Sequence, residues 1–260
     1  MLIDSHAHIT DEQYGDGGKG IIASMTADNL AAIVCVGCDE QSTLSSIAVA
    51  HTDPRIFASV GVHPYYPETV TQELLDKFKR LAESDEKVVA VGEFGLDYHH
   101  DEYDREAQIR AMNAQYDLAR ELKLPIIFHV REATGDFTEF LRTREFPESG
   151  VMHCFSGSVE TAEICLKKGL YLSFGGKLTY KNSKHLQDAA KHAPLERILI
   201  ETDAPYLSPA QKLGEINYPK NVAFVRDKLA ELKGISPDEA EKATAENTKR
   251  LFFRMKSLGA

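Results

Sequence analysis

The chain has 260 residues, of which 43% are hydrophobic and 27% charged, and its formal net charge is −10. This is the composition of a soluble globular protein, and the length suits one large domain, which we expect to span residues 1–260. The negative charge argues against sequence-independent binding to nucleic acid or to an anionic membrane. It leaves an anionic substrate open, because bound cations can reverse the local field.

The predicted elements alternate between short apolar strands and amphipathic helices. The predicted strands cover residues 2–4, 31–36, 55–60, 87–92, 125–130, 150–153, 170–174 and 197–202. The predicted helices cover residues 20–29, 41–50, 71–84, 104–123, 133–144, 159–168, 182–192, 220–233 and 237–255. Eight strand–helix units predict an α/β fold with parallel strands, namely a (β/α)8 TIM barrel with an additional C-terminal helix. An open doubly wound sheet is the alternative.

The first strand leads into two histidines, His6 and His8, which are two residues apart. In an extended strand this spacing places both imidazoles on one face. Imidazole is the commonest ligand for transition-metal ions, so the pair indicates a metal site. Two polar residues that merely follow a strand end are the alternative interpretation.

Further metal-ligand residue types follow other predicted strands. His63 follows the third predicted strand, and the other four, Glu93, His129, His153 and Asp203, lie at the ends of the fourth, fifth, sixth and eighth. In a TIM barrel the carboxyl ends of all strands meet at one mouth, so we expect these side chains to converge there. Buried like charges repel unless cations separate them, which predicts bound Zn²⁺, Mn²⁺ or a similar ion. The set is large enough for two ions, with Glu93 as the bridging carboxylate.

Six ordered motifs resemble the TatD-type metal-dependent deoxyribonucleases of the amidohydrolase superfamily. They are residues 4–8 (DSHAH), 61–64 (GVHP), 92–98 (GEFGLDY), 124–133 (LPIIFHVREA), 153–157 (HCFSG) and 201–207 (ETDAPYL). The resemblance extends over nearly the whole chain and includes a seventh-strand loop at 173–182. Two segments depart from the family pattern. Residues 217–221 (NYPKN) replace an Asn-Glu-Pro-like element, and residues 99–102 (HHDE) are unusually acidic and histidine-rich.

The resemblance implies a set of site residues. His6, His8, Glu93 and Asp203 would hold one metal ion, and Glu93 would bridge to a second ion held by His129 and His153. His63 matches the histidine that faces the substrate phosphate. The implied cofactors are two divalent ions, Mg²⁺, Mn²⁺ or Zn²⁺, and the implied activity is hydrolysis of DNA phosphodiester bonds by a metal-activated water.

Roles for individual side chains follow from phosphodiester chemistry. The catalytic residues would be Asp203, as general base for the water, Glu93, and His63, which would bind the phosphate or protonate the leaving group. Arg131 would bind a phosphate oxygen, and Lys177 would belong to a small basic patch, unless that lysine is ordinary surface. We also expect Glu201 to support a ligand or form a barrel ion pair, and Asp4 to set a ligand histidine's tautomer.

Several questions of function and location stay open at this stage. The charge favours DNA ends or single strands as substrate over long duplex DNA. Alternatives are another amidohydrolase-type enzyme that cleaves a small C–N, lactone or phosphoester bond, and a non-catalytic metal-binding protein. Without a signal segment or a membrane-spanning run, we expect a cytoplasmic protein with reduced cysteines and no obligate protein partner. Cys35 and Cys38 form a C-x-x-C pattern, which we interpret as small buried thiols and not as a redox or zinc pair.

Overall fold

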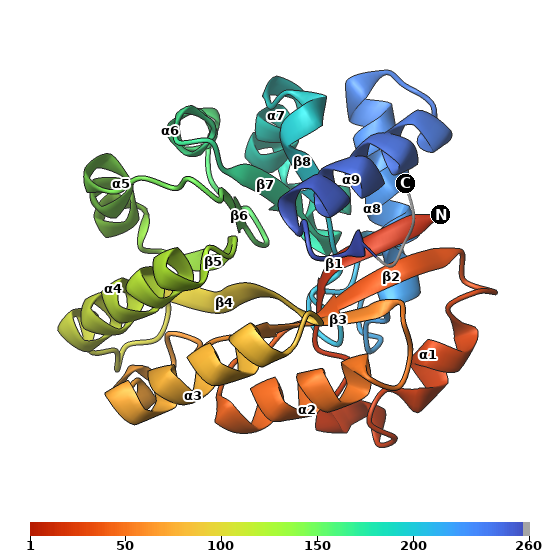
Figure 1. Ribbon diagram of the computed structural model, residues 1–260. Coiled ribbons are helices and arrows are strands. Elements are labelled where there is room, and N and C mark those ends of the chain that lie inside the picture. Colours follow the sequence, from red (N-terminus) through yellow and green to blue (C-terminus); the bar gives the residue numbers. More distant parts are fainter. Residues whose placement is uncertain (257–260) are drawn as a thin grey trace.

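The computed structural model describes residues 1–256 and contains one eight-stranded parallel sheet (Figure 1). The strands follow one another around the sheet in chain order, each paired with the next. They are β1 (Leu2–Ala7), β2 (Leu30–Cys35), β3 (Ile56–Val60), β4 (Val88–Asp97), β5 (Ile126–Arg131), β6 (Gly150–Met152), β7 (Tyr171–Phe174) and β8 (Ile198–Ile200). We predicted that the domain extends to residue 260, and residues 257–260 lie outside the described residues.

The first and last strands meet and nearly close the sheet into a barrel. Ala7 and Ala204 form an isolated parallel bridge just beyond the end of β8. The amide of Asp203 donates to the carbonyl of His6 at 2.9 Å, and the amide of His8 donates to the carbonyl of Ala204 at 2.7 Å. The TIM-barrel prediction is therefore confirmed, and the closing contacts run through candidate site residues.

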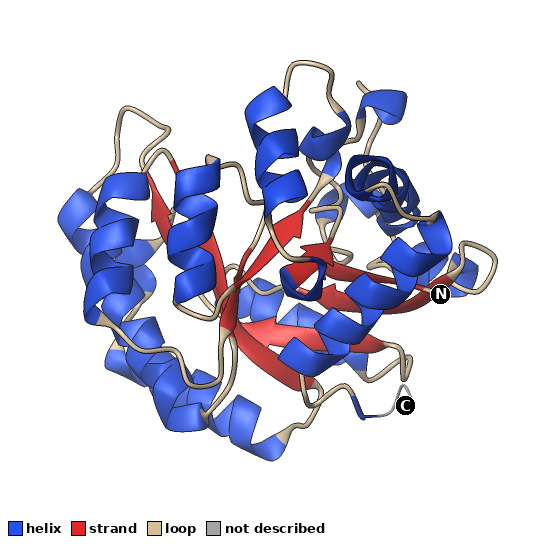
Figure 2. Cartoon of the chain, turned by 90° about the horizontal axis from the view of Figure 1, so that it is seen from above, coloured by secondary structure: helices blue, strands red, loops and turns tan. Residues whose placement is uncertain are grey.

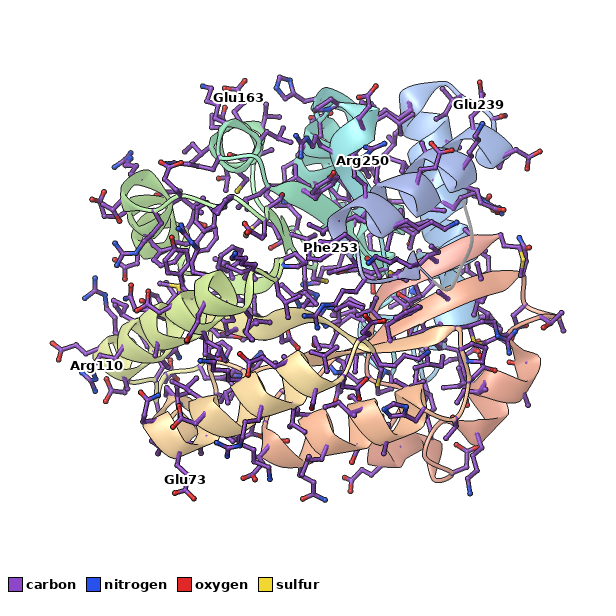
Figure 3. All side chains as sticks on the ribbon, viewed as in Figure 1. Glu73, Arg110, Glu163, Glu239, Arg250 and Phe253 are labelled. Carbon is purple, nitrogen blue, oxygen red and sulfur yellow. The ribbon has the colours of Figure 1, made fainter. Side chains whose placement is uncertain are left out.

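Helices surround the strands on the outside, as the view from above in Figure 2 shows. The α-helices are α1 (Lys19–Ser24), α2 (Glu40–Ala50), α3 (Gln72–Ser84), α4 (Arg105–Leu122), α5 (Thr134–Thr143), α6 (Val159–Lys167), α7 (Lys184–His192), α8 (Val222–Lys233) and α9 (Pro237–Leu251). Short 3-10 helices are η1 (Glu12–Tyr14), η2 (Pro67–Thr69), η3 (Gly176–Thr179), η4 (Leu195–Arg197), η5 (Ala210–Lys212) and η6 (Pro219–Asn221). Charged side chains such as Glu73, Arg110 and Glu163 project outward from these helices (Figure 3). Within residues 1–256, no helix combines the length and apolar character that crossing a bilayer requires.

Two apolar clusters divide the core, and the period-two alternation of the strands separates them. The larger cluster joins the outward faces of the strands to the surrounding helices and includes Ile126 and Phe128. The smaller cluster fills the barrel interior near the start of the strands and includes Ile127, Val151 and Leu199. Leu251, Phe252 and Met255, at and beyond the end of α9, pack into this inner cluster. The end of the predicted C-terminal helix and the residues after it therefore close the amino end of the barrel.

Some predicted boundaries were wrong. β1 runs to Ala7 and β4 runs to Asp97, beyond the predicted ends at residues 4 and 92. Both extensions carry polar residues that a water-exposed strand end would also show, so composition alone did not reveal them. The predicted helix at 20–29 ends at Ser24, because the chain then turns to start β2. Residues 204–219, between β8 and α8, form a long loop that contains the short η5 turn and the first residue of η6.

Candidate metal centre

Strand alternation explains why polar side chains converge at one end of the barrel. Ile127, Val151 and Leu199 point into the apolar interior. His129, His153 and Glu201 each lie two residues after one of these apolar residues. Because side chains alternate between the two faces of a strand, they point to the same interior. The inward face thus changes from apolar to ionisable within one step, and this change places the site at the carboxyl end of the barrel.

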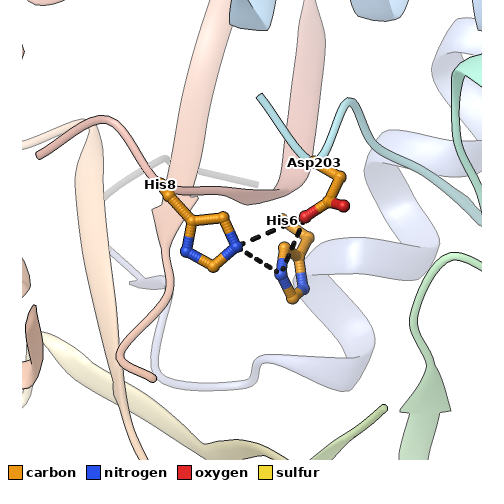
Figure 4. A group of neighbouring side chains, drawn as sticks. All are labelled: His6, His8 and Asp203. Carbon is orange, nitrogen blue, oxygen red and sulfur yellow. Dashed lines mark hydrogen bonds and ion pairs between the residues drawn. The ribbon is translucent and has the colours of Figure 1, made fainter. Parts of the chain in front are cut away.

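The first group of side chains consists of His6, His8 and Asp203 (Figure 4). The Nε2 atoms of His6 and His8 are 3.3 Å apart. Asp203 Oδ1 lies 3.6 Å from His6 Nε2 and 3.3 Å from His8 Nε2. Glu93 Oε1 completes the group at 3.5 Å from both imidazole nitrogens. Four potential ligand atoms therefore face one another across a common point.

The second group uses the other oxygen of the same glutamate. Glu93 Oε2 lies 3.3 Å from His129 Nδ1 and 3.1 Å from His153 Nε2. The two groups are consequently joined by one carboxylate, with one oxygen in each. The structure brings together all six predicted ligand residues, from β1 and the residue after it, from β4 and β5, and from the loops after β6 and β8.

The spacing of these atoms fits ligands around metal ions. Ligand atoms about 2.0–2.2 Å from one tetrahedral ion lie roughly 3.3–3.6 Å from one another. Of the six pairs among the four atoms of the first group, the five other than Glu93–Asp203 are 3.3 to 3.6 Å apart. The donor types are imidazole nitrogen and carboxylate oxygen, which suit divalent transition-metal ions. Residues and spacing of the first group therefore fit a metal ion, and the second group offers the same donor types.

Outer hydrogen bonds orient three of the four histidines. His8 Nδ1–H donates to the carbonyl of Val36 at 3.2 Å, which leaves Nε2 free to face the first group. His129 Nε2–H donates to Asp97 Oδ2 at 2.9 Å, and His153 Nδ1–H donates to Glu201 Oε1 at 3.1 Å. Such partners fix the tautomer and ring orientation of a metal-binding histidine. The ring of His6 instead stacks on that of His153, with centroids 3.8 Å apart.

Electrostatics keep the two central carboxylates ionised. Burial alone would raise the pKa of Glu93, but His153, His6 and His129 around it hold that pKa well below its ordinary value. Burial likewise opposes ionisation of Asp203, yet His8, His153 and His6 lower its pKa. Both side chains therefore present negative oxygens to the histidine groups at neutral pH.

His63 lies beside the second group as a neutral side chain. Its ring centroid is 4.3 Å from that of His129, and its Nδ1 accepts the amide N–H of Tyr65 at 3.2 Å. Burial, followed by the neighbouring His129, lowers the pKa of His63 to about 3. Because Nδ1 is an acceptor, Nε2 carries the proton. His63 is therefore a hydrogen-bond donor and not a cation at neutral pH.

The two predicted phosphate-binding cations lie further out. Arg131 ends β5, where its Cα pairs with that of Asp97 across the β4–β5 ladder. Lys177 lies half-buried in η3, near enough to Cys154 to act on the pKa of that thiol. Within residues 1–256, neither cation forms an ion pair with Glu93 or Asp203. Both side chains thus border the centre without neutralising it.

Sequence reasoning missed two residues and misassigned a third. The thiol of Cys38 donates a hydrogen bond to Glu93 Oε1 at 3.3 Å, and burial raises the pKa of that thiol to about 12. Asp97 accepts the hydrogen bond of His129 Nε2, and no role was predicted for it from the sequence. Period-two counting would have found both, because Cys38 lies two residues after inward-facing Val36 and Asp97 lies four after Glu93. Asp4 does not contact a histidine ring; its carboxylate accepts from the amide and hydroxyl of Thr202.

The remaining pattern residues have structural roles. Cys35 is buried in the outer cluster and contacts Ser46, whereas Cys38 faces the site, so the two are separate free thiols. Asn217 donates to the carbonyls of Thr202 and Tyr206 and holds the loop after β8 in place. These bonds depend on contacts distant in sequence, which a local pattern does not specify.

Comparisons with known proteins agree with this geometry. The family model for TatD-related DNases matches residues 3–253. An uncharacterised metal-dependent hydrolase of Bacillus subtilis, YabD, is 41% identical over 97% of this chain and 99% of its own length. A 3′-5′ ssDNA/RNA exonuclease of Erwinia tasmaniensis, TatD, is 30% identical over 96% of this chain and 99% of its own. The crystal structure of the Escherichia coli TatD homologue YjjV is 30% identical and superposes with a TM-score of 0.92 over 97% of this chain and 98% of that one.

Proposed function

This chain belongs to the TatD-related DNase family, and we propose that it is a metal-dependent phosphodiesterase that removes nucleotides from single-stranded DNA ends. The observation that carries the proposal is the shared carboxylate of Glu93, with one oxygen in each of two groups of ligand-type side chains. Two closely spaced ions bridged in this way are characteristic of enzymes that cleave phosphate esters.

The ligand residues divide between two proposed ions. His6, His8 and Asp203 would hold the first ion, His129 and His153 would hold the second, and Glu93 would contact both. When bound, the ions would neutralise phosphate charge and lower the pKa of the attacking water. The nitrogen-rich donor set favours Zn²⁺ or Mn²⁺ over Mg²⁺, which prefers oxygen ligands in octahedral geometry.

The protein's own side chains complete the proposed chemistry. Asp203, ionised beside His6 and His8, would accept the proton of the attacking water. His63, neutral with its proton on Nε2, would donate a hydrogen bond to the phosphate or to the leaving oxygen. Arg131 and Lys177, both unpaired with the central carboxylates, would bind further phosphate oxygens.

The preference for single strands has two supports. A net charge of −10 disfavours the extended phosphate contacts by which proteins grip long duplex DNA. The exonuclease of Erwinia tasmaniensis, which matches this chain over nearly all of both lengths, carries single-stranded DNA and RNA in its name. We therefore propose an end or a short unpaired segment as the substrate.

The test is cleavage of end-labelled single-stranded DNA by metal-stripped protein to which Zn²⁺, Mn²⁺ or Mg²⁺ is returned. Cleavage should depend on the ion, and Glu93→Gln should lower kcat/KM by roughly 10³-fold or more, because the bridging charge is lost. Glu163→Gln is the matched control, since Glu163 projects from the outer face of α6. If the wild type binds two ions but cleaves no strand, the nuclease proposal fails, and a small-ester or C–N hydrolase becomes the better assignment.

A further inference from the structure

Two half-exposed tyrosines flank the candidate metal centre on opposite sides. Tyr65 follows β3 and is 44% exposed, and Tyr206 follows β8 and is 47% exposed. The ring of Tyr65 packs edge-on against His63, with centroids 4.3 Å apart. The ring of Tyr206 packs edge-on against His8 at 5.9 Å. One ring therefore stands beside the second group and the other beside the first.

Each tyrosine is fixed to a site residue through its backbone. The amide of Tyr65 donates to His63 Nδ1 at 3.2 Å, and the amide of Tyr206 donates to the carbonyl of Asp203 at 2.9 Å. The hydroxyls are also held, because Tyr206 donates to Asp11 at 2.7 Å and Tyr65 pairs with His100 at 2.9 Å. Such rings lose little conformational freedom when a ligand binds. Their position relative to the metal centre is set before substrate arrives.

A chain of contacts connects the two rings through the site. Tyr65 contacts His63, which packs on His129, whose Nδ1 faces Glu93. On the other side, Tyr206 contacts His8, which faces the other oxygen of Glu93. A phosphate bound by the two proposed ions beside Glu93 would therefore have one tyrosine on each side. The sugar-phosphate backbone carries one base on each side of every internal phosphodiester bond, which matches this arrangement.

We propose that Tyr65 and Tyr206 are two nucleobase-stacking subsites, one on each side of the scissile phosphate. The proposal rests on the proposed nuclease function and deepens it. Base–aromatic stacking tolerates any sequence, because every base has a π-face. In a duplex those faces are covered by neighbouring bases, so stacking on tyrosine requires an unpaired, unstacked nucleotide. The two rings would thus select single-stranded ends.

The test uses the full-length, Mn²⁺-loaded protein and a short thymidylate strand with cleavage-resistant phosphorothioate linkages and one 2-aminopurine. Stacking on a tyrosine quenches 2-aminopurine fluorescence, so the readout does not depend on catalysis. Tyr65→Leu should abolish quenching at one position of the probe, and Tyr206→Leu at another. Tyr65→Phe and Tyr206→Phe, which keep the rings, should retain it.

Binding affinity supplies the second arm. Each Leu variant should bind the intact strand roughly 5- to 150-fold more weakly, the range expected for one lost base stack. The same variants should bind a strand with an abasic residue at that position as well as the wild type does. Phe253→Leu is the matched control, because Phe253 is a similarly exposed ring (45%) beyond the end of α9, at the amino end of the barrel.

The outcomes separate the two proposals. Equal loss of affinity for intact and abasic strands would overturn stacking and leave the nuclease function standing. Unchanged quenching and affinity in both Leu variants would also overturn stacking and leave the nuclease function standing. If the wild type neither binds nor cleaves any strand, the nuclease proposal itself fails, and the stacking proposal fails with it.

Discussion

The two ends of the barrel interior are built from the same strands but differ completely in chemistry. At the amino end, Ile127, Val151 and Leu199 pack with Phe252 from the C-terminal segment. At the carboxyl end, His129, His153 and Glu201 occupy the next inward positions. One strand geometry therefore supports both stability and chemistry, and a separation of two residues along the strand divides them. Changes at the two ends should therefore affect different measurements.

The largest effect should come from opening the apolar end. Phe252 is fully buried, so Phe252→Ala should lower the free energy of unfolding by about 3–5 kcal/mol, through lost burial and the cavity left behind. Denaturant unfolding of the metal-free protein measures this change. Ion stoichiometry of the folded variant should stay at the wild-type value. A lower stoichiometry would contradict the independence of the two ends.

A smaller effect should follow from a change at the polar end. Asp97→Asn removes the carboxylate that accepts from His129 Nε2, so the affinity for one ion should fall roughly 10- to 100-fold. Competition with a chelating dye measures the two affinities separately, and only that of the group containing His129 should change. Asp227→Asn is the matched control, because Asp227 lies on the outer surface of α8. Equal weakening of both ions would show that Asp97 acts on the whole site.

The smallest effect should come from Cys38. The thiol donates to Glu93, so Cys38→Ala should weaken ion binding about 5-fold, equivalent to roughly 1 kcal/mol for one hydrogen bond. Cys38→Ser keeps a donor and should restore most of the affinity. If the thiol stays a hydrogen-bond donor to Glu93, the Co²⁺-loaded protein should lack a thiolate charge-transfer band. Such a band would make Cys38 a metal ligand and not a hydrogen-bond donor.

The site was more predictable than the contacts that support it. His6, Glu93 and His153 were found because metal-ligand residue types follow successive strands, and a parallel barrel brings strand ends together. The pairing of Asp4 with Thr202 joins residues 198 positions apart, and no local pattern specifies it. Cys35 and Cys38 were both interpreted as small buried thiols, whereas the structure buries Cys35 in the outer cluster and directs Cys38 to Glu93.

Closure of the barrel through His6, His8 and Asp203 also has a consequence for biosynthesis. The amide of Asp203 bonds to the carbonyl of His6, so the last ligand in the sequence is placed by the first. A growing chain on the ribosome exposes both histidines early but cannot complete the first group until residue 203 has emerged. The first ion should therefore be taken up only after nearly the whole polypeptide has been made. Incomplete or truncated chains that lack residue 203 would then lack the complete first group and the hydrolytic activity that depends on it.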